Sequence, residues 1–176
     1  MIEPVSVLPT KDNQGRIKVY RWFALSLLAL LLDQISKQMI AQQMDLHQSI
    51  ELLPFFNLYY VHNYGAAFSF LSDQSGWQRW FFSITTSIIS LGIVFWITRL
   101  KASQQLLIIA LSLVLGGALG NLYDRIMYGY VIDFIDWHIG NSHWPAFNIA
   151  DSSIFLGAVL LILDTFLHPE TDKKKD

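Results

Sequence analysis

The chain has 176 residues, of which 53% are hydrophobic and only 15% are charged, and it contains no cysteine. Because soluble domains carry about 25% charged residues, this composition excludes an ordinary soluble globular protein and a disordered chain. The net charge of −2 offers no basic surface for nucleic acid, and the lack of cysteine excludes disulfides, thiolate nucleophiles and cysteine-based zinc sites.

Four segments approach the length of about 20 mostly apolar residues that a helix needs to cross a bilayer. Two of them, in the middle of the chain, are uncharged throughout. The first and the last contain aspartates and reach this length only if an acid is accepted inside the span. The sequence therefore predicts an all-α membrane protein with four transmembrane helices and a small subdomain of strands and loops outside the membrane. The predicted spans are residues 22–40, 80–98, 102–123 and 149–167.

A cleavable signal peptide is the alternative interpretation of the first 32 residues, because several basic side chains precede an apolar run there. No cleavage site made of small residues follows this run. The helical pattern continues instead through Asp33-Gln-Ile-Ser-Lys37. We therefore expect an uncleaved first span.

The positions of lysine and arginine predict the orientation of the chain in the membrane. Nine of the 12 basic residues lie in an N-terminal arm (residues 1–21), in the Arg99-Leu-Lys101 turn or in a C-terminal tail (residues 168–176). Basic residues favour the cytoplasmic side, so both termini are predicted to be cytoplasmic. Residues 22–167 then form one membrane domain, whose outer segments are residues 41–79 and 124–148.

This topology places the aspartates that lie in or beside the apolar spans at a similar depth, near the outer surface of the membrane. Asp33 lies in the outer half of the first span, Asp124 ends the third, Asp151 begins the fourth, and Asp133 follows in an outer segment. Ionisable groups at membrane depth are costly and usually face a bundle interior or a wet cavity. These four aspartates are therefore candidates for a functional site.

The first outer segment contains an aromatic stretch, residues 57–70, that is interrupted at Gly65. This composition predicts short strands or an interfacial cradle in which tyrosine and tryptophan lie at the headgroup level. An aromatic belt that only positions the protein accounts for most of these residues. Asn63 and Gly65 are the candidates for a further role.

The end of the third span carries glycines and polar residues together. Gly116 and Gly120 form a GxxxG pair, which allows close approach of another helix or of an extended peptide. Asn121, Asp124 and Arg125 share one face if the helix continues, so Arg125 is a possible ion-pair partner for Asp124.

The start of the fourth span has an ordinary structural interpretation. Asn148 suits a helix cap, and a carboxylate at position 151 would be favoured by the helix dipole. Both effects would stabilise the helix without giving Asp151 a chemical task.

Few kinds of catalysis are compatible with these residues. His138 and His143 match no zinc-ligand pattern, and there is no GxSxG elbow or phosphate-binding glycine loop. Paired carboxylates that share a proton and act on water remain as the strongest catalytic hypothesis. A proton- or ion-coupled membrane carrier and a lipid-binding scaffold are the alternatives. Spacing alone does not decide whether Asp124 or Asp133 would pair with Asp151.

Several ordered motifs resemble the bacterial lipoprotein signal peptidases, also called signal peptidase II, over nearly the whole length of the chain. The resemblance implies an inner-membrane aspartic endopeptidase that cleaves the signal peptide from diacylglyceryl-modified prolipoproteins just before the lipidated cysteine. The matching stretches are Leu32-Asp-Gln-Ile-Ser-Lys37, His62-Asn-Tyr-Gly-Ala-Ala-Phe-Ser69, Gly116-Gly-Ala-Leu-Gly-Asn-Leu-Tyr-Asp-Arg125, Val131-Ile-Asp-Phe134 and Phe147-Asn-Ile-Ala-Asp151.

The resemblance also assigns roles to residues. It implies that Asp133 and Asp151 are catalytic and that the site lies near the periplasmic face. We expect a monomer that contacts membrane lipids and its prolipoprotein substrate, with no metal, cofactor or nucleic acid. The supporting polar or substrate-binding residues are Asp33, Lys37, Asn63, Gly65, Asn121, Asp124, Arg125 and Asn148, and those for helix packing or substrate approach are Gly116, Gly117 and Gly120.

Overall fold

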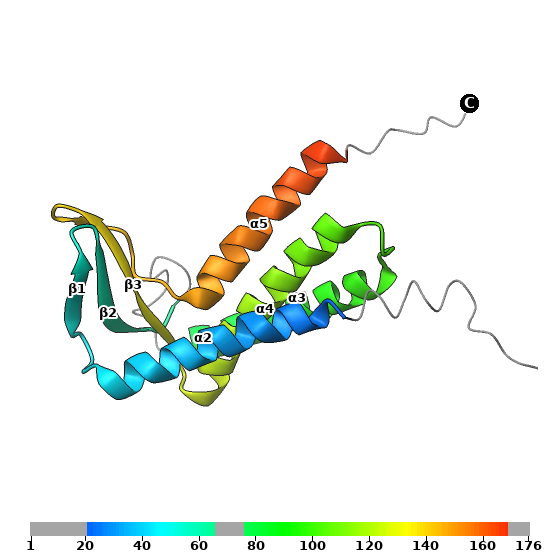
Figure 1. Ribbon diagram of the computed structural model, residues 1–176. Helices are drawn as coiled ribbons and strands as arrows, with labels where there is room; N and C mark the ends of the chain where they lie inside the picture. The colour runs from blue at the N-terminus through cyan, green and yellow to red at the C-terminus, as the bar shows by residue number, and fades with distance from the viewer. Residues whose placement is uncertain (1–20, 66–75, 169–176) are drawn as a thin grey trace, which may run out of the picture.

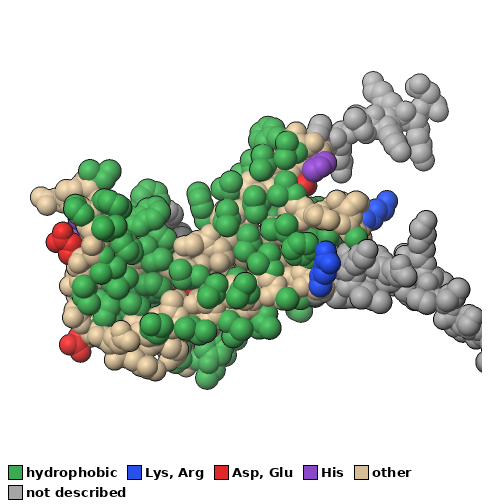
Figure 2. Space-filling model, viewed as in Figure 1, with side chains coloured by type: hydrophobic (Ala, Val, Ile, Leu, Met, Phe, Trp, Pro, Cys, Tyr) green, Lys and Arg blue, Asp and Glu red, His purple; other side chains and the backbone are tan. Residues whose placement is uncertain are grey.

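Four long helices form the body of the protein in a computed structural model that describes residues 21–65 and 76–168 (Figure 1). All four are long and apolar enough to cross a membrane, as the sequence predicts. The exposed hydrophobic side chains cover their outer surfaces (Figure 2). The helices are α2 (Phe23–Gln43), α3 (Trp77–Arg99), α4 (Gln105–Met127) and α5 (Ile149–Leu167).

Helix α4 is the central element of the bundle, because it packs against each of the other three helices. Its buried face joins α3 in an apolar cluster that includes Ile93, Ile97, Ile108, Leu111 and Leu115. Glycines allow the closest approaches. A Cβ on Gly116 would lie 2.6 Å from the Ser26 carbonyl oxygen of α2, and one on Gly157 of α5 would lie 2.7 Å from the Ala110 carbonyl oxygen of α4. Glycine at these points therefore brings the helix backbones close together.

A small antiparallel sheet lies at the end of the bundle where α2 ends and α5 begins (Figure 1). Its strand order follows the chain, and β2 carries a bulge between Leu58 and Val61 where it pairs with β3. Ile40 and Met44 of α2 pack against the sheet together with Tyr60, Ile132 and Phe134. The strands are β1 (Ser49–Leu53), β2 (Phe56–Asn63), β3 (Val131–Ile139) and β4 (Ser142–His143).

Two local features set where β3 and α5 begin. Gly129 has a φ of +89°, and this left-handed turn leads the chain from α4 into β3. Asn148 caps α5 by accepting the backbone N–H of Asp151, while the Asp151 side chain accepts the backbone N–H of Asn148. This reciprocal capping box fixes the Asp151 side chain over the first turn of the helix.

Candidate active site

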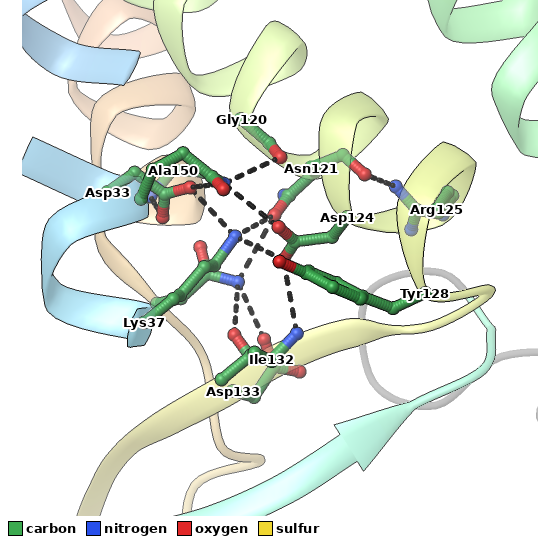
Figure 3. Close-up of polar contacts among 12 residues, drawn as sticks. Asp33, Lys37, Gly120, Asn121, Asp124, Arg125, Tyr128, Ile132, Asp133 and Ala150 are labelled. Atoms are coloured by element: carbon green, nitrogen blue, oxygen red, sulfur yellow. Dashed lines mark hydrogen bonds and ion pairs between the residues drawn. The ribbon is translucent and has the colours of Figure 1, made fainter. Parts of the chain in front are cut away.

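The centre of the polar cluster is the ammonium group of Lys37, which is only 1% exposed (Figure 3). It lies 2.8 Å from Asp33 Oδ2 and 2.8 Å from Asp124 Oδ2, and it donates to Asn121 Oδ1 at 3.0 Å. Three N–H groups thus meet three oxygens. Lys37 is one turn after Asp33 on α2, so both side chains lie on the same helix face.

The two carboxylates that bind Lys37 also hold neighbouring elements. Asp33 Oδ1 accepts the backbone N–H of Ala150 at 2.8 Å, which joins α2 to the start of α5. Asp124 Oδ2 accepts the backbone N–H of Ile132 at 3.2 Å, which joins α4 to β3. Because both carboxylates are fully buried, these contacts with a cation and with N–H donors are needed to offset the cost of desolvation.

Gln34 belongs to the same cluster, although the sequence did not single it out. Its amide nitrogen donates to Asp33 Oδ2, to the Gly120 carbonyl oxygen and to Asp124 Oδ1, at 3.1, 3.2 and 2.9 Å. A polar side chain between two charged ones in an apolar span is the signal that marks it.

Asn121 connects this cluster to Asp151. Its Oδ1 accepts from Lys37 and from Asn148 Nδ2, and its Nδ2 donates to Asp151 Oδ1 at 2.7 Å. The amide is therefore oriented with its oxygen toward the ammonium group and its nitrogen toward the carboxyl group.

Asp133 and Asp151 both contact one side chain, that of Asn148. Asn148 Nδ2 donates to Asp133 Oδ1 at 2.7 Å, and Asn148 Oδ1 accepts the backbone N–H of Asp151 at 2.9 Å. The fully buried Asn148 thus holds β3 and the first turn of α5 together. Burial, followed by the nearby Asp151 carboxyl group, raises the pKa of Asp133 to about 7. Such an acid retains its proton in part near neutral pH.

Asn63 and Arg125 complete the far side of the cluster. Asn63 Nδ2 donates to Asp133 Oδ2 at 2.9 Å, and Asn63 Oδ1 accepts the backbone N–H of Gly65. The Arg125 guanidinium donates to the carbonyl oxygens of Gly65 and Asn121, and it lies over the Phe82 ring. Asp124 therefore pairs with Lys37, whereas Arg125 holds the backbone of the segment that positions Asn63.

The three glycines of α4 face neighbouring protein groups. A Cβ on Gly116 would meet Ser26 and Ala29 of α2, and one on Gly117 would meet the Ala150 carbonyl oxygen of α5. A Cβ on Gly120 would lie 2.5 Å from Asp33 Oδ2. Of the two roles that the sequence left open, these contacts favour helix packing over approach of a substrate backbone.

The two histidines lie apart from this cluster, in the hairpin formed by β3 and β4. Their rings stack with centroids 4.8 Å apart, and His143 Nδ1 lies 2.9 Å from the Asp136 carboxylate. Within residues 21–65 and 76–168, no group of three or more His, Asp or Glu side chains could hold a metal ion.

Comparisons with known proteins agree on one family. A family model described as signal peptidase (SPase) II matches residues 25–167. The lipoprotein signal peptidase of Alteromonas mediterranea is 54% identical over 156 residues, which cover 89% of this chain and 85% of that protein. The lipoprotein signal peptidase of Shewanella oneidensis is 53% identical over 155 residues, which cover 88% of this chain and 91% of that protein.

Two solved structures of bacterial membrane enzymes, determined by the in meso method at 2.3 and 1.9 Å resolution, are also similar. Both are 35% identical to this chain, with TM-scores of 0.77 and 0.73. The first alignment covers 89% of this chain and 93% of the other, and the second covers 86% and 94%.

Proposed function

This chain belongs to the signal peptidase II family, and from that premise we propose that it is an aspartic endopeptidase with Asp133 and Asp151 as its catalytic pair. Its substrate is a diacylglyceryl-modified prolipoprotein, and it cleaves the signal peptide just before the lipidated cysteine. The family relatives that carry the name lipoprotein signal peptidase support the substrate class.

The observation that carries this proposal is that Asn148 contacts both aspartates, since its side-chain amide donates to the Asp133 carboxyl group and its backbone N–H donates to the Asp151 carboxyl group. Asp133 Oδ1 accepts from the Asn148 amide nitrogen and the Asp151 backbone donates to the Asn148 amide oxygen. Two carboxyl groups close enough for the charge of Asp151 to act on Asp133 are disposed to share a proton, because the doubly ionised pair is unfavourable in a buried site. One group then takes a proton from water while the other gives a proton to the peptide carbonyl oxygen.

The spacing of residues in the sequence did not decide whether Asp124 or Asp133 pairs with Asp151. The hydrogen-bond and ion-pair partners of the two acids distinguish them. Asp124 is bound by the Lys37 ammonium group and the Ile132 backbone. Within the described part of the chain, the hydrogen-bond donors to the Asp133 carboxyl group are the side-chain amides of Asn63 and Asn148. An acid without a bound cation remains available for proton transfer, which favours Asp133 as the partner of Asp151.

We further propose that both termini are cytoplasmic and that the catalytic pair lies near the periplasmic face. The Lys and Arg side chains visible on the molecule lie at the end away from the sheet (Figure 2), in agreement with the preference of basic residues for the cytoplasm. Residues 22–167 then act as one membrane domain, between an N-terminal arm and a C-terminal tail, and the protein works as a monomer. A lipidated precursor would meet the pair at the outer membrane boundary, where its lipid and signal helix both lie.

The direct test is incubation of the purified protein in micelles with a diacylglyceryl-modified precursor and with its unlipidated counterpart. The masses of the products identify the cleaved bond. We expect cleavage of the lipidated precursor immediately before the modified cysteine and little or no cleavage of the other. Cleavage elsewhere, or equal cleavage of both precursors, would contradict the proposed substrate.

A further inference from the structure

The Lys37 ammonium group fixes the direction of the hydrogen bonds that lead to Asp151. An ammonium group has donors and no acceptor. Asn121 must therefore turn its amide oxygen toward Lys37, at 3.0 Å, and its amide nitrogen toward Asp151 Oδ1, at 2.7 Å. Reversal of this amide would set donor against donor at Lys37 and would leave a buried cation with one partner fewer.

Among the described residues, the hydrogen bonds to the Asp151 carboxyl group all come from N–H donors. Asn121 donates to its Oδ1, and the backbone N–H of Asn148 donates to its Oδ2 at 3.3 Å. Its position in the first turn of α5 adds the positive end of the helix dipole. The Arg125 guanidinium interacts electrostatically with Asp151 and also with Asp133. Each of these groups favours a negative charge on Asp151 over a proton.

Asp133 has a different environment. It is 2% exposed and accepts from the neutral amides of Asn63 and Asn148. The charged groups that act on it are the Asp151 carboxylate on α5, Lys37 on α2 and Arg125 on α4. Burial outweighs the two cations, since the pKa of Asp133 is raised. Asp33 and Asp124 on the adjoining helices are bound to Lys37. Burial opposes the charge of Asp151 as well, so the Asn121 amide held by Lys37 and the dipole of α5 are what favour the proton on Asp133 over a proton on Asp151.

We infer that Lys37, acting through the Asn121 amide, keeps the negative charge of the pair on Asp151, so that Asp151 is the general base and Asp133 the general acid. This inference rests on the proposed aspartic peptidase function. Lys37 and Asn121 are positioning residues in this account, because they act on substrate only through Asp151.

The assignment defines a balanced reaction. Water gives a proton to the Asp151 carboxylate and its oxygen bonds to the peptide carbonyl carbon, while Asp133 gives its proton to the carbonyl oxygen. The resulting gem-diol then loses its C–N bond. The departing nitrogen takes the proton from Asp151, and one hydroxyl returns a proton to Asp133. The products are a carboxylic acid and an amine, and the pair regains its starting protonation.

The test compares the pH dependence of kcat/KM for three proteins. In the wild type we expect a bell-shaped profile. On the acidic limb, activity is lost because Asp151 becomes protonated. On the alkaline limb, activity is lost because Asp133 becomes ionised. Asn121→Ala removes a donor to Asp151 and should move only the acidic limb, by about 1 pH unit upward. Asn63→Ala, the matched control, removes a donor to Asp133 and should move only the alkaline limb upward.

The assignment would be overturned if Asn121→Ala moved the alkaline limb and Asn63→Ala moved the acidic limb. A uniform fall in activity without movement of either limb would also overturn it, because a merely structural role for Asn121 produces that outcome. The limbs belong to the pair as a whole, so a second measurement identifies the individual acids.

Infrared titration with ¹³C-labelled aspartate tests the same inference without turnover, in Asp133→Asn and Asp151→Asn proteins. The remaining Asp133 should keep its proton to a higher pH than the remaining Asp151 does, and the reverse order would overturn the inference. Failure of the wild type to cleave any precursor would instead contradict the proposed function and would leave this infrared test intact.

Discussion

Two clusters in the described part of the chain pair a buried aspartate with a basic side chain, and they differ in how far water reaches them. In the first, Lys37 is buried between Asp33 and Asp124. In the second, Asp136 is buried, but the His143 that pairs with it is 50% exposed, and Asn57 also donates to Asp136 at 2.9 Å. The comparison teaches that burial of the cation, more than the presence of an ion pair, makes a cluster necessary to the fold.

The largest expected effect on stability follows loss of the buried cation. Lys37→Met would leave Asp33 and Asp124 as uncompensated buried carboxylates, which destabilises a protein by about 3–5 kcal/mol. We expect most of the protein to be unfolded or absent from the membrane. Unfolding by heat in detergent micelles measures the change. Lys101→Met, at an exposed lysine in the turn between α3 and α4, is the control and should behave as the wild type. Equal stability of both variants would contradict the importance given to burial.

The second effect is a dependence of stability on pH that comes from Asp133. Its pKa is raised from 3.8 to about 7 in the folded protein, so the folded state keeps a proton that the unfolded state has lost. Its contribution to stability is fully present below about pH 4 and is lost as the pH rises through about 7. At about 1.4 kcal/mol for each pH unit, the loss reaches about 4 kcal/mol.

Asp133→Asn removes this titration. We therefore expect the free energy of unfolding of the wild type to fall relative to that of Asp133→Asn between pH 4 and pH 8, as measured by thermal unfolding at both pH values. A constant difference between the two proteins across this range would show that Asp133 does not titrate there.

A smaller loss of stability is expected from a substitution at the close contact between α4 and α5. In Gly117→Ala the new methyl group would meet the Ala150 carbonyl oxygen and would lie 2.8 Å from Ile154 Cγ1. Forcing α5 away from α4 should cost about 1–3 kcal/mol and should also displace Asp151. Gly92→Ala on α3 is the matched control, because no atom of the described residues lies within 4 Å of its Cβ position. The control should be neutral or more stable by up to about 1 kcal/mol, and an equal loss in both variants would mean that close packing is not the cause.

The smallest effect is expected in the hairpin. His143→Ala removes an exposed partner from Asp136, while Asn57 continues to donate to that carboxylate. We expect a loss of less than about 1 kcal/mol and unchanged cleavage of precursor, measured by thermal unfolding and by initial rates. A loss comparable to that of Lys37→Met would remove the contrast between the two clusters.

The sequence predicted the four helices well because hydrophobicity determines them directly. It predicted residues 149–167 for the last span, and α5 has these bounds because the Asn148 capping box marks its start. The predicted span 80–98 begins after Arg79 and the predicted span 102–123 stops before Asp124, whereas α3 and α4 include these charged residues. A charge does not end a helix when it has partners. Arg79 of α3 donates to the Arg125 carbonyl oxygen, and Asp124 of α4 is bound by Lys37.

The sheet and the site were less accessible to sequence reasoning. The aromatic stretch indicated β2, but Asp133 and Asp136 interrupt the apolar pattern of β3, and that strand was not predicted. The contacts of Gln34 with Gly120 and Asp124 join residues 86 and 90 positions apart, and no local pattern contains such information. The choice of Asp133 as the partner of Asp151 came from family resemblance and stays a prediction.

The central claim is that Asp133 and Asp151, and not the other buried acids, perform the cleavage. The most direct measurement is the initial rate of cleavage of a lipidated precursor by Asp133→Asn, Asp151→Asn and, as a control, Asp136→Asn, an aspartate on the same strand whose carboxylate belongs to the hairpin cluster. With all three shown to be folded, we expect the first two to lose activity by at least about 1,000-fold and the third to keep nearly all of it. Substantial turnover by either Asp133→Asn or Asp151→Asn, or an equal loss in Asp136→Asn, would contradict the account.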